Sequence, residues 1–103
     1  MGNPKEKKRV QKLAKQVRGI PTPASGAIGG GTFDINTRNC AIEEKGESVV
    51  FKLSGTTAWE KLVGQADAAG KMPILVAGDK VVLRLADFVD ILSLLDNIPL
   101  NNV

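Results

Sequence analysis

The spacing of apolar residues predicts a helix near the start of the chain and two more further along. Apolar side chains recur at i, i+3, i+4 and i+7 within residues 5–17, and Gly19 would end that helix. A second stripe begins at Trp59 and would stop at Gly70. The third helix, about residues 86–95, is apolar over more than one stripe, which predicts a buried or partner-facing helix.

Alternation of apolar and polar residues predicts strands between these helices. Three strands are expected to form an antiparallel meander: residues 32–37, 40–45 and 48–53. Two more are expected on either side of a tight turn at Gly78-Asp79: residues 73–77 and 81–85. The order helix, meander, helix, strand, strand, helix predicts one α/β domain over residues 1–103, with a mixed central sheet flanked by helices.

Residues 19–32 are expected to form a mobile surface loop. Two prolines and five glycines fall within these fourteen residues. A long loop in a small domain is often functional.

Basic charge is concentrated in the first helix. Residues 1–18 hold seven Lys and Arg side chains against one acid, Glu6, although the net charge of the chain is only +3. Such a face fits a polyanion, and the residues expected to contact phosphates are Lys7, Lys8, Arg9, Lys12 and Lys15. A solvated lysine-rich helix is the alternative, and an acidic membrane surface is less favoured because this helix lacks Trp and Phe.

Composition excludes several classes of chemistry. The chain contains no histidine, which rules out Ser-His-Asp and Cys-His triads and His-ligated zinc. A single cysteine, Cys40, permits no internal disulfide and predicts a reducing, cytoplasmic location. No apolar run is long enough to cross a bilayer, and no secretory signal is expected.

Asp34, Glu43 and Lys45 form the candidate site. If residues 32–37 and 40–45 pair as a hairpin, Asp34 comes beside Glu43, and Lys45 emerges on the same face as Glu43. Two adjacent carboxylates suit Mg²⁺, with Mn²⁺ as a substitute, and a lysine would stabilise charge developing on a phosphate. The alternative is a polar outer strand face with a Glu–Lys pair.

The same residues carry a resemblance to a nuclease family. Asp34 followed by Glu43-Glu44-Lys45 resembles the PD-(D/E)xK motif, and residues 23–27 resemble a segment of archaeal Holliday junction resolvases and their phage homologues. The resemblance implies a restriction-endonuclease-like core and Mg²⁺-dependent hydrolysis of DNA phosphodiesters, with a four-way junction as substrate. It also implies a homodimer in a prokaryotic cell or phage-infected host.

Roles for individual residues follow from this resemblance. It implies that Asp34 and Glu43 bind the metal and that Lys45 activates the attacking water. Glu6, which extends the inward stripe of the first helix, would complete the metal site, although it could simply favour the helix N-terminus. Ser25 would contact the DNA backbone near the scissile phosphate. Glu44 could replace Glu43, but the period of two along a strand favours Glu43.

Other functions fit parts of the sequence. A non-catalytic DNA-binding module would use the basic helix alone, and a repair or restriction nuclease would share the motif. An interaction protein would use the apolar third helix. The residues expected at a dimer interface are Phe88, Ile91, Leu92 and Leu95, which could instead pack against the sheet of their own subunit.

Overall fold

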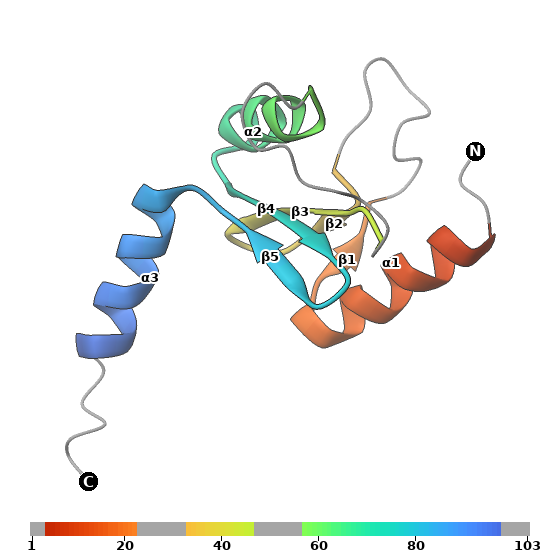
Figure 1. The fold of residues 1–103 in the computed structure, drawn as a ribbon, viewed down its shortest axis with the longest axis horizontal. Coiled ribbons are helices and arrows are strands. Elements are labelled where there is room, and N and C mark those ends of the chain that lie inside the picture. Colours follow the sequence, from red (N-terminus) through yellow and green to blue (C-terminus); the bar gives the residue numbers. More distant parts are fainter. Residues whose placement is uncertain (1–3, 23–32, 47–56, 98–103) are drawn as a thin grey trace, which may run out of the picture.

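The computed structural model describes residues 4–22, 33–46 and 57–97 as three helices and a five-stranded mixed sheet (Figure 1). The elements in chain order are α1 (Pro4–Val17), β1 (Ile20–Pro21), β2 (Ile35–Asn36), β3 (Cys40–Glu44), α2 (Thr57–Ala69), β4 (Met72–Ala77), β5 (Lys80–Val82) and α3 (Leu85–Asn97). The strands lie in the order β1-β2-β3-β4-β5. The expected α/β class and mixed sheet are therefore confirmed.

Helices α1 and α2 cover opposite faces of the sheet (Figure 1). On the α1 side, Ala14 packs with Ile35, Ile42 and Val76. The cluster on the α2 side consists of Phe33, Ala41, Leu62, Ala66 and Leu75, with Trp59 packed against it. Because neighbouring strand residues point to opposite faces, β3 supplies Ala41 to one layer and Ile42 to the other.

The antiparallel meander lies earlier in the chain than expected. Strand β1 pairs with β2, and β2 with β3, both antiparallel. Ile20 and Pro21 were expected in the loop, but Pro21 is compatible with this edge strand because an edge leaves one side of the backbone unpaired. The next neighbour of β3 is β4, which runs parallel to it along its whole length after the α2 crossover. The strand expected at residues 48–53 lies outside the described residues.

The remaining elements match their expected positions with small shifts at the ends. Gly70 follows α2 with a φ of +68°, which is the left-handed conformation expected of a helix stop. Strand β5 ends at Val82 rather than at residue 85, because Leu85 already belongs to α3. Of the loop expected at residues 19–32, the part from residue 23 onward lies outside the described residues.

Helix α3 extends away from the sheet instead of covering it (Figure 1). None of its described residues is buried, and Leu95 is 51% exposed. Arg84 anchors the start of the helix, through contacts of 3.0 Å with Asp67 of α2 and 2.8 Å with Asp87 of α3. The alternative in which the apolar side chains of α3 pack against their own sheet is therefore wrong.

The close approach of α1 to the sheet requires a glycine at its end. Arg18 adopts a left-handed φ of +57°, and the Gly19 N–H donates to the Ala14 carbonyl at 2.8 Å. A Cβ on Gly19 would lie only 2.5 Å from Cγ2 of Ile35 and 3.1 Å from Cγ2 of Thr37. Residue 19 therefore sets the distance between helix and strand.

We predict that Gly19→Ala lowers the free energy of unfolding by about 1–3 kcal/mol, because the added methyl forces the α1–β2 junction apart. Gly64→Ala is the matched control, since a Cβ at this α2 position meets nothing within 4 Å. That control should stabilise the protein by up to about 1 kcal/mol through helix propensity. Urea denaturation measures both, and equal stability of the two variants would contradict the prediction.

Candidate functional site

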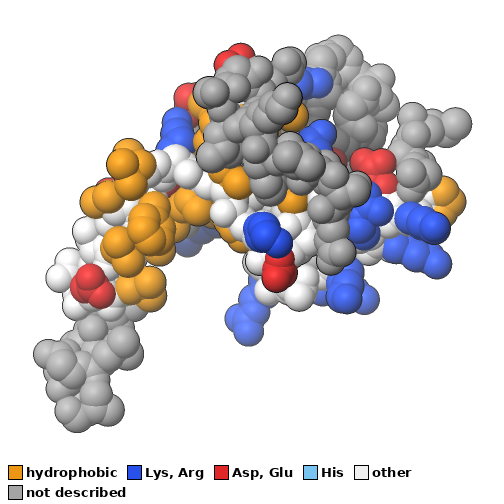
Figure 2. All heavy atoms as spheres, viewed as in Figure 1, with side chains coloured by type: hydrophobic (Ala, Val, Ile, Leu, Met, Phe, Trp, Pro, Cys, Tyr) orange, Lys and Arg blue, Asp and Glu red, His pale blue; other side chains and the backbone are white. Residues whose placement is uncertain are grey.

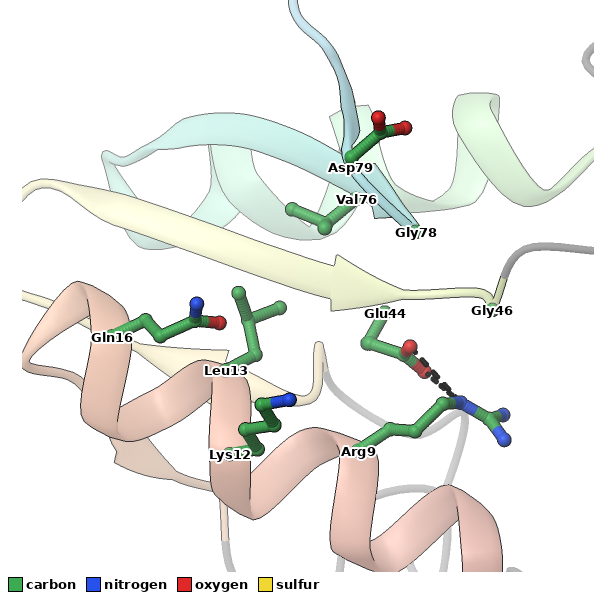
Figure 3. Close-up of a pocket in the computed structure, with 9 residues that line it drawn as sticks. All are labelled: Arg9, Lys12, Leu13, Gln16, Glu44, Gly46, Val76, Gly78 and Asp79. Atoms are coloured by element: carbon green, nitrogen blue, oxygen red, sulfur yellow. Dashed lines mark hydrogen bonds and ion pairs between the residues drawn. The ribbon is translucent and has the colours of Figure 1, made fainter.

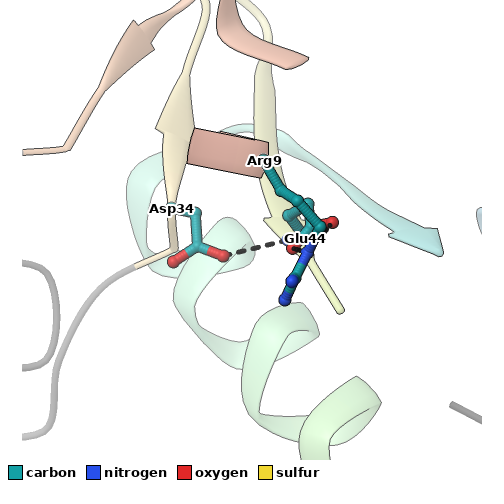
Figure 4. A network of polar contacts seen from close by, with 3 residues as sticks. All are labelled: Arg9, Asp34 and Glu44. Atoms are coloured by element: carbon teal, nitrogen blue, oxygen red, sulfur yellow. Dashed lines mark hydrogen bonds and ion pairs between the residues drawn. The ribbon is translucent and has the colours of Figure 1, made fainter. Parts of the chain in front are cut away.

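Asp34 and Glu43 lie side by side at one end of the β2–β3 pair. Ile35 of β2 pairs with Ile42 of β3 in an antiparallel register. Asp34, the residue before β2, therefore lies opposite Glu43. The backbone N–H of Glu44 donates to Oδ2 of Asp34 at 2.9 Å (Figure 4). The N–H of Thr22, the residue after β1, donates to the Asp34 carbonyl at 2.8 Å and also holds Asp34 in place.

Lys45 is the cation of this group. Its Nζ lies 3.4 Å from Oε2 of Glu43, as the alternation of side chains along a strand predicts. Glu44, between them, points to the opposite face and toward α1. The structure therefore brings Asp34, Glu43 and Lys45 together and separates Glu44 from them.

Burial and like charge raise the pKa values of both carboxyl groups. The pKa of Glu43 is raised to about 7, mainly by burial and also by the negative charge of Asp34, while Lys45 opposes the increase. Burial also raises the pKa of Asp34, against the lowering effect of the Glu44 N–H. A hydrogen bond between the two carboxyl groups raises the pKa of Glu43 and lowers that of Asp34, as expected when Glu43 holds the proton. Near neutral pH this pair therefore favours a proton or another cation between its oxygens.

Glu6 approaches Asp34 from α1. It is half-buried, and its negative charge contributes to the raised pKa of Asp34. A cavity of about 290 Å³ lies beside Glu6 and Asp34, and its other lining residues are Lys7, Val10, Gln11, Pro21 and Thr22. The inward position expected for Glu6 thus places it at a cavity that Asp34 also lines.

An ion pair on the opposite face of β3 joins the same strand to α1. Nε of Arg9 donates to both carboxylate oxygens of Glu44, at 3.2 and 3.1 Å, and the Glu44 side chain is only 6% exposed (Figure 3). A second cavity, of about 660 Å³, lies beside the pair between α1 and the β4–β5 turn; Lys12, Gln16 and Asp79 are among its lining residues. Sequence reasoning missed this pair, although an acid on the inward, apolar face of a strand was a signal for it.

The basic residues of α1 are exposed, as a phosphate-binding surface requires. This holds for Lys7, Lys8, Arg9, Lys12 and Lys15. Figure 2 shows Lys and Arg side chains gathered over α1. Arg9 differs from the others because Glu44 engages it, although its side chain is still 45% exposed. Ser25 lies outside the described residues.

Within the described ranges, no three His, Cys, Asp or Glu side chains are grouped so that they could hold a metal ion. Asp34 and Glu43 bring two carboxyl groups into hydrogen-bond contact. Across the same ranges, no helix combines the length and apolar character that a membrane span needs.

Comparison with known proteins identifies no relative of this chain. No protein-family model matches it, and neither a curated protein nor a solved structure does.

We predict that Glu43→Gln changes the pH dependence of stability. Because the folded pKa of Glu43 is raised, its proton-linked stabilisation is complete below about pH 4.5 and is lost as the pH rises through about 7. The glutamine variant lacks this loss, so its unfolding free energy relative to the parent should rise by about 2 kcal/mol between about pH 5 and pH 8.

Glu60→Gln, at an exposed position of α2, serves as the control and should show no such change. Urea denaturation at the two pH values measures the difference. A parallel pH response of the parent and Glu43→Gln would show that the pKa of Glu43 is not raised in the folded protein.

Proposed function

We propose that this protein is a metal-dependent endodeoxyribonuclease of the PD-(D/E)xK type, with a restriction-endonuclease-like core and branched DNA, such as a four-way junction, as its substrate. The observation that carries this proposal is the juxtaposition of Asp34, Glu43 and Lys45 at the end of β2 and β3. The order of helix, three-stranded meander, helix and strand also supports it, because the resemblance implies that order.

The donor set suits a hard divalent cation. Asp34 and Glu43 offer carboxylate oxygens, and their raised pKa values indicate that two negative charges are costly here without a cation. Mg²⁺ held by Asp34 and Glu43, with Glu6 as a further or water-mediated ligand, would remove that cost. When bound, the cation supplies Lewis-acid polarisation of a phosphate oxygen.

The other residues of the site act on the substrate. Lys45 is half-buried and paired with Glu43, so its ammonium is held where negative charge develops on the scissile phosphate and where an attacking water can be oriented. Lys7 lines the cavity beside Glu6 and Asp34, and it would bind a neighbouring phosphate. The exposed lysines Lys8, Lys12 and Lys15 would extend this contact along the DNA backbone and make binding salt-dependent.

A second candidate is a DNA-binding module that does not cleave. It is favoured by the absence, in the described ranges, of a group of three metal-ligating side chains. In that case the basic face of α1 would bind DNA phosphates, and Asp34 and Glu43 would share a proton. Cleavage assays separate the two candidates directly.

We predict that the protein cuts a labelled four-way junction in the presence of Mg²⁺ and not in EDTA. Asp34→Asn and Glu43→Gln should abolish cleavage and leave DNA binding largely intact. Lys45→Met should lower kcat about 100-fold, because it removes one charge that stabilises the transition state. Asp79→Asn, at a side chain that is 88% exposed, is the control and should cleave normally.

A panel of junction, flap, nicked and linear duplex substrates then identifies the preferred branch. Cleavage that persists in Asp34→Asn would show that the acids are not the site. Binding without cleavage of any substrate in Mg²⁺ or Mn²⁺ would favour the non-catalytic module.

We further propose that the nuclease is a homodimer joined through α3. The apolar stripe of this helix includes Phe88, Ile91, Leu92 and Leu95, and hydrophobic side chains gather along it in Figure 2. An apolar groove of about 330 Å³ lies at its base, lined by Val81, Val82, Leu83, Leu85 and Phe88. One molecule thus presents both a groove and an apolar helix end, and a second copy offers the same two surfaces in return. Reciprocal contact of this kind closes into a two-fold dimer.

We predict that Leu95→Glu converts the dimer to a monomer, because it places a charge in the apolar stripe. Leu94→Glu is the matched control: successive helix residues are about 100° apart, so Leu94, which is 68% exposed, lies outside that stripe. Sedimentation velocity measures the mass of each variant, and circular dichroism confirms the fold. A monomeric parent, or a dimer in both variants, would overturn this interface.

A further inference from the structure

We propose that Arg9 is a positioning residue of the nuclease, since its ion pair with Glu44 fixes α1 against the end of β3. This inference rests on the function proposed above and deepens it. The Arg9–Glu44 ion pair sets the position of Glu6 beside Asp34, although this ion pair lies on the face of β3 opposite to Glu43.

The ion pair is buried on its acidic side. Glu44 is the buried charged residue among the described ones, and Nε of Arg9 lies 3.1 and 3.2 Å from its two oxygens. A buried carboxylate without a cation would be strongly unfavourable, so Glu44 holds the guanidinium, and with it α1, at this point.

Glu44 is connected to the acidic site through its backbone. The N–H of this residue donates to Oδ2 of Asp34 at 2.9 Å, while its side chain binds Arg9 (Figure 4). Arg9 follows Glu6 by three residues, which is about one helical turn. A shift of α1 along β3 would therefore strain the contact at Glu44 and move Glu6 relative to Asp34 together.

The surroundings of Arg9 are shaped for a guanidinium. Gly46 has a left-handed φ of +77°, and a Cβ at this position would lie 3.3 Å from Nη2 of Arg9. The planar group thus packs against the backbone at Gly46 while it pairs with Glu44. A lysine would supply the charge without this planar contact.

The competing role for Arg9 is to bind a DNA phosphate, as its neighbours in α1 are proposed to do. Glu44→Gln separates the two roles because it removes a negative charge and leaves every cation in place. A residue that served only phosphates would bind DNA as well or better in that variant, with kcat unchanged. A positioning residue would lose kcat.

The experiment is steady-state cleavage of a four-way junction in Mg²⁺ by the parent and by Arg9→Gln, Glu44→Gln and the double variant. We expect each single variant to lower kcat at least about 10-fold, with KM of Glu44→Gln within about 3-fold of the parent. The kcat of the Arg9→Gln/Glu44→Gln double variant should be no lower than that of the slower single variant. Arg9→Lys should recover only part of the rate. Lys12→Gln, which removes a cation of the same helix, should instead raise KM.

Each outcome decides the inference. If the parent cleaves and Glu44→Gln retains its kcat, the positioning role is overturned while the nuclease stands. If the parent cleaves no branched DNA, the proposed function and this inference fail together. Should a single variant unfold, the Arg9→Met/Glu44→Met pair removes both charges at once; a folded double variant with the parental kcat also overturns the role.

Discussion

The alternation of side chains along β3 is the constraint on which the site depends. Glu43 and Glu44 are adjacent in sequence, yet they meet opposite environments because a strand turns successive side chains to opposite faces. Glu43 faces Asp34 and Lys45, whereas Glu44 faces Arg9 on α1. A shift of one residue in the pairing of β2 and β3 would exchange these partners and bury Glu43 against the helix.

This arrangement concentrates negative charge and offsets it locally. The negative charges of Glu6 and Glu43 both lie near Asp34, and burial adds to the cost of ionising Asp34 and Glu43. Lys45 and the Glu44 N–H oppose that cost only in part. The site therefore stabilises the fold less when it is fully ionised, and a bound cation would recover what the repulsion costs.

The sequence predicted those parts of the fold that local periodicity determines. The helical stripes, the β3 strand and the Gly70 stop are properties of neighbouring residues, and the structure confirms them. Strand β1 was missed because Pro21 and the surrounding glycines favour a loop locally, while its pairing with β2 is a tertiary contact. The Arg9–Glu44 pair spans 35 residues, so no local pattern could select Arg9 from the other cations of α1.

The position of helix α3 was left open by the sequence. Its apolar stripe fitted both a buried helix and a partner-facing one, and the chain directs it away from the sheet, with Arg84 holding its first turn against α2. A helix of 13 residues is marginal on its own in water, and the proposed dimer would cover its exposed apolar side. A two-fold dimer built there would also hold two copies of the Asp34–Glu43 site at one fixed separation. Such a pair of sites fits a substrate that itself has two-fold symmetry, so selection by the shape of the DNA would follow from assembly rather than from contacts to bases.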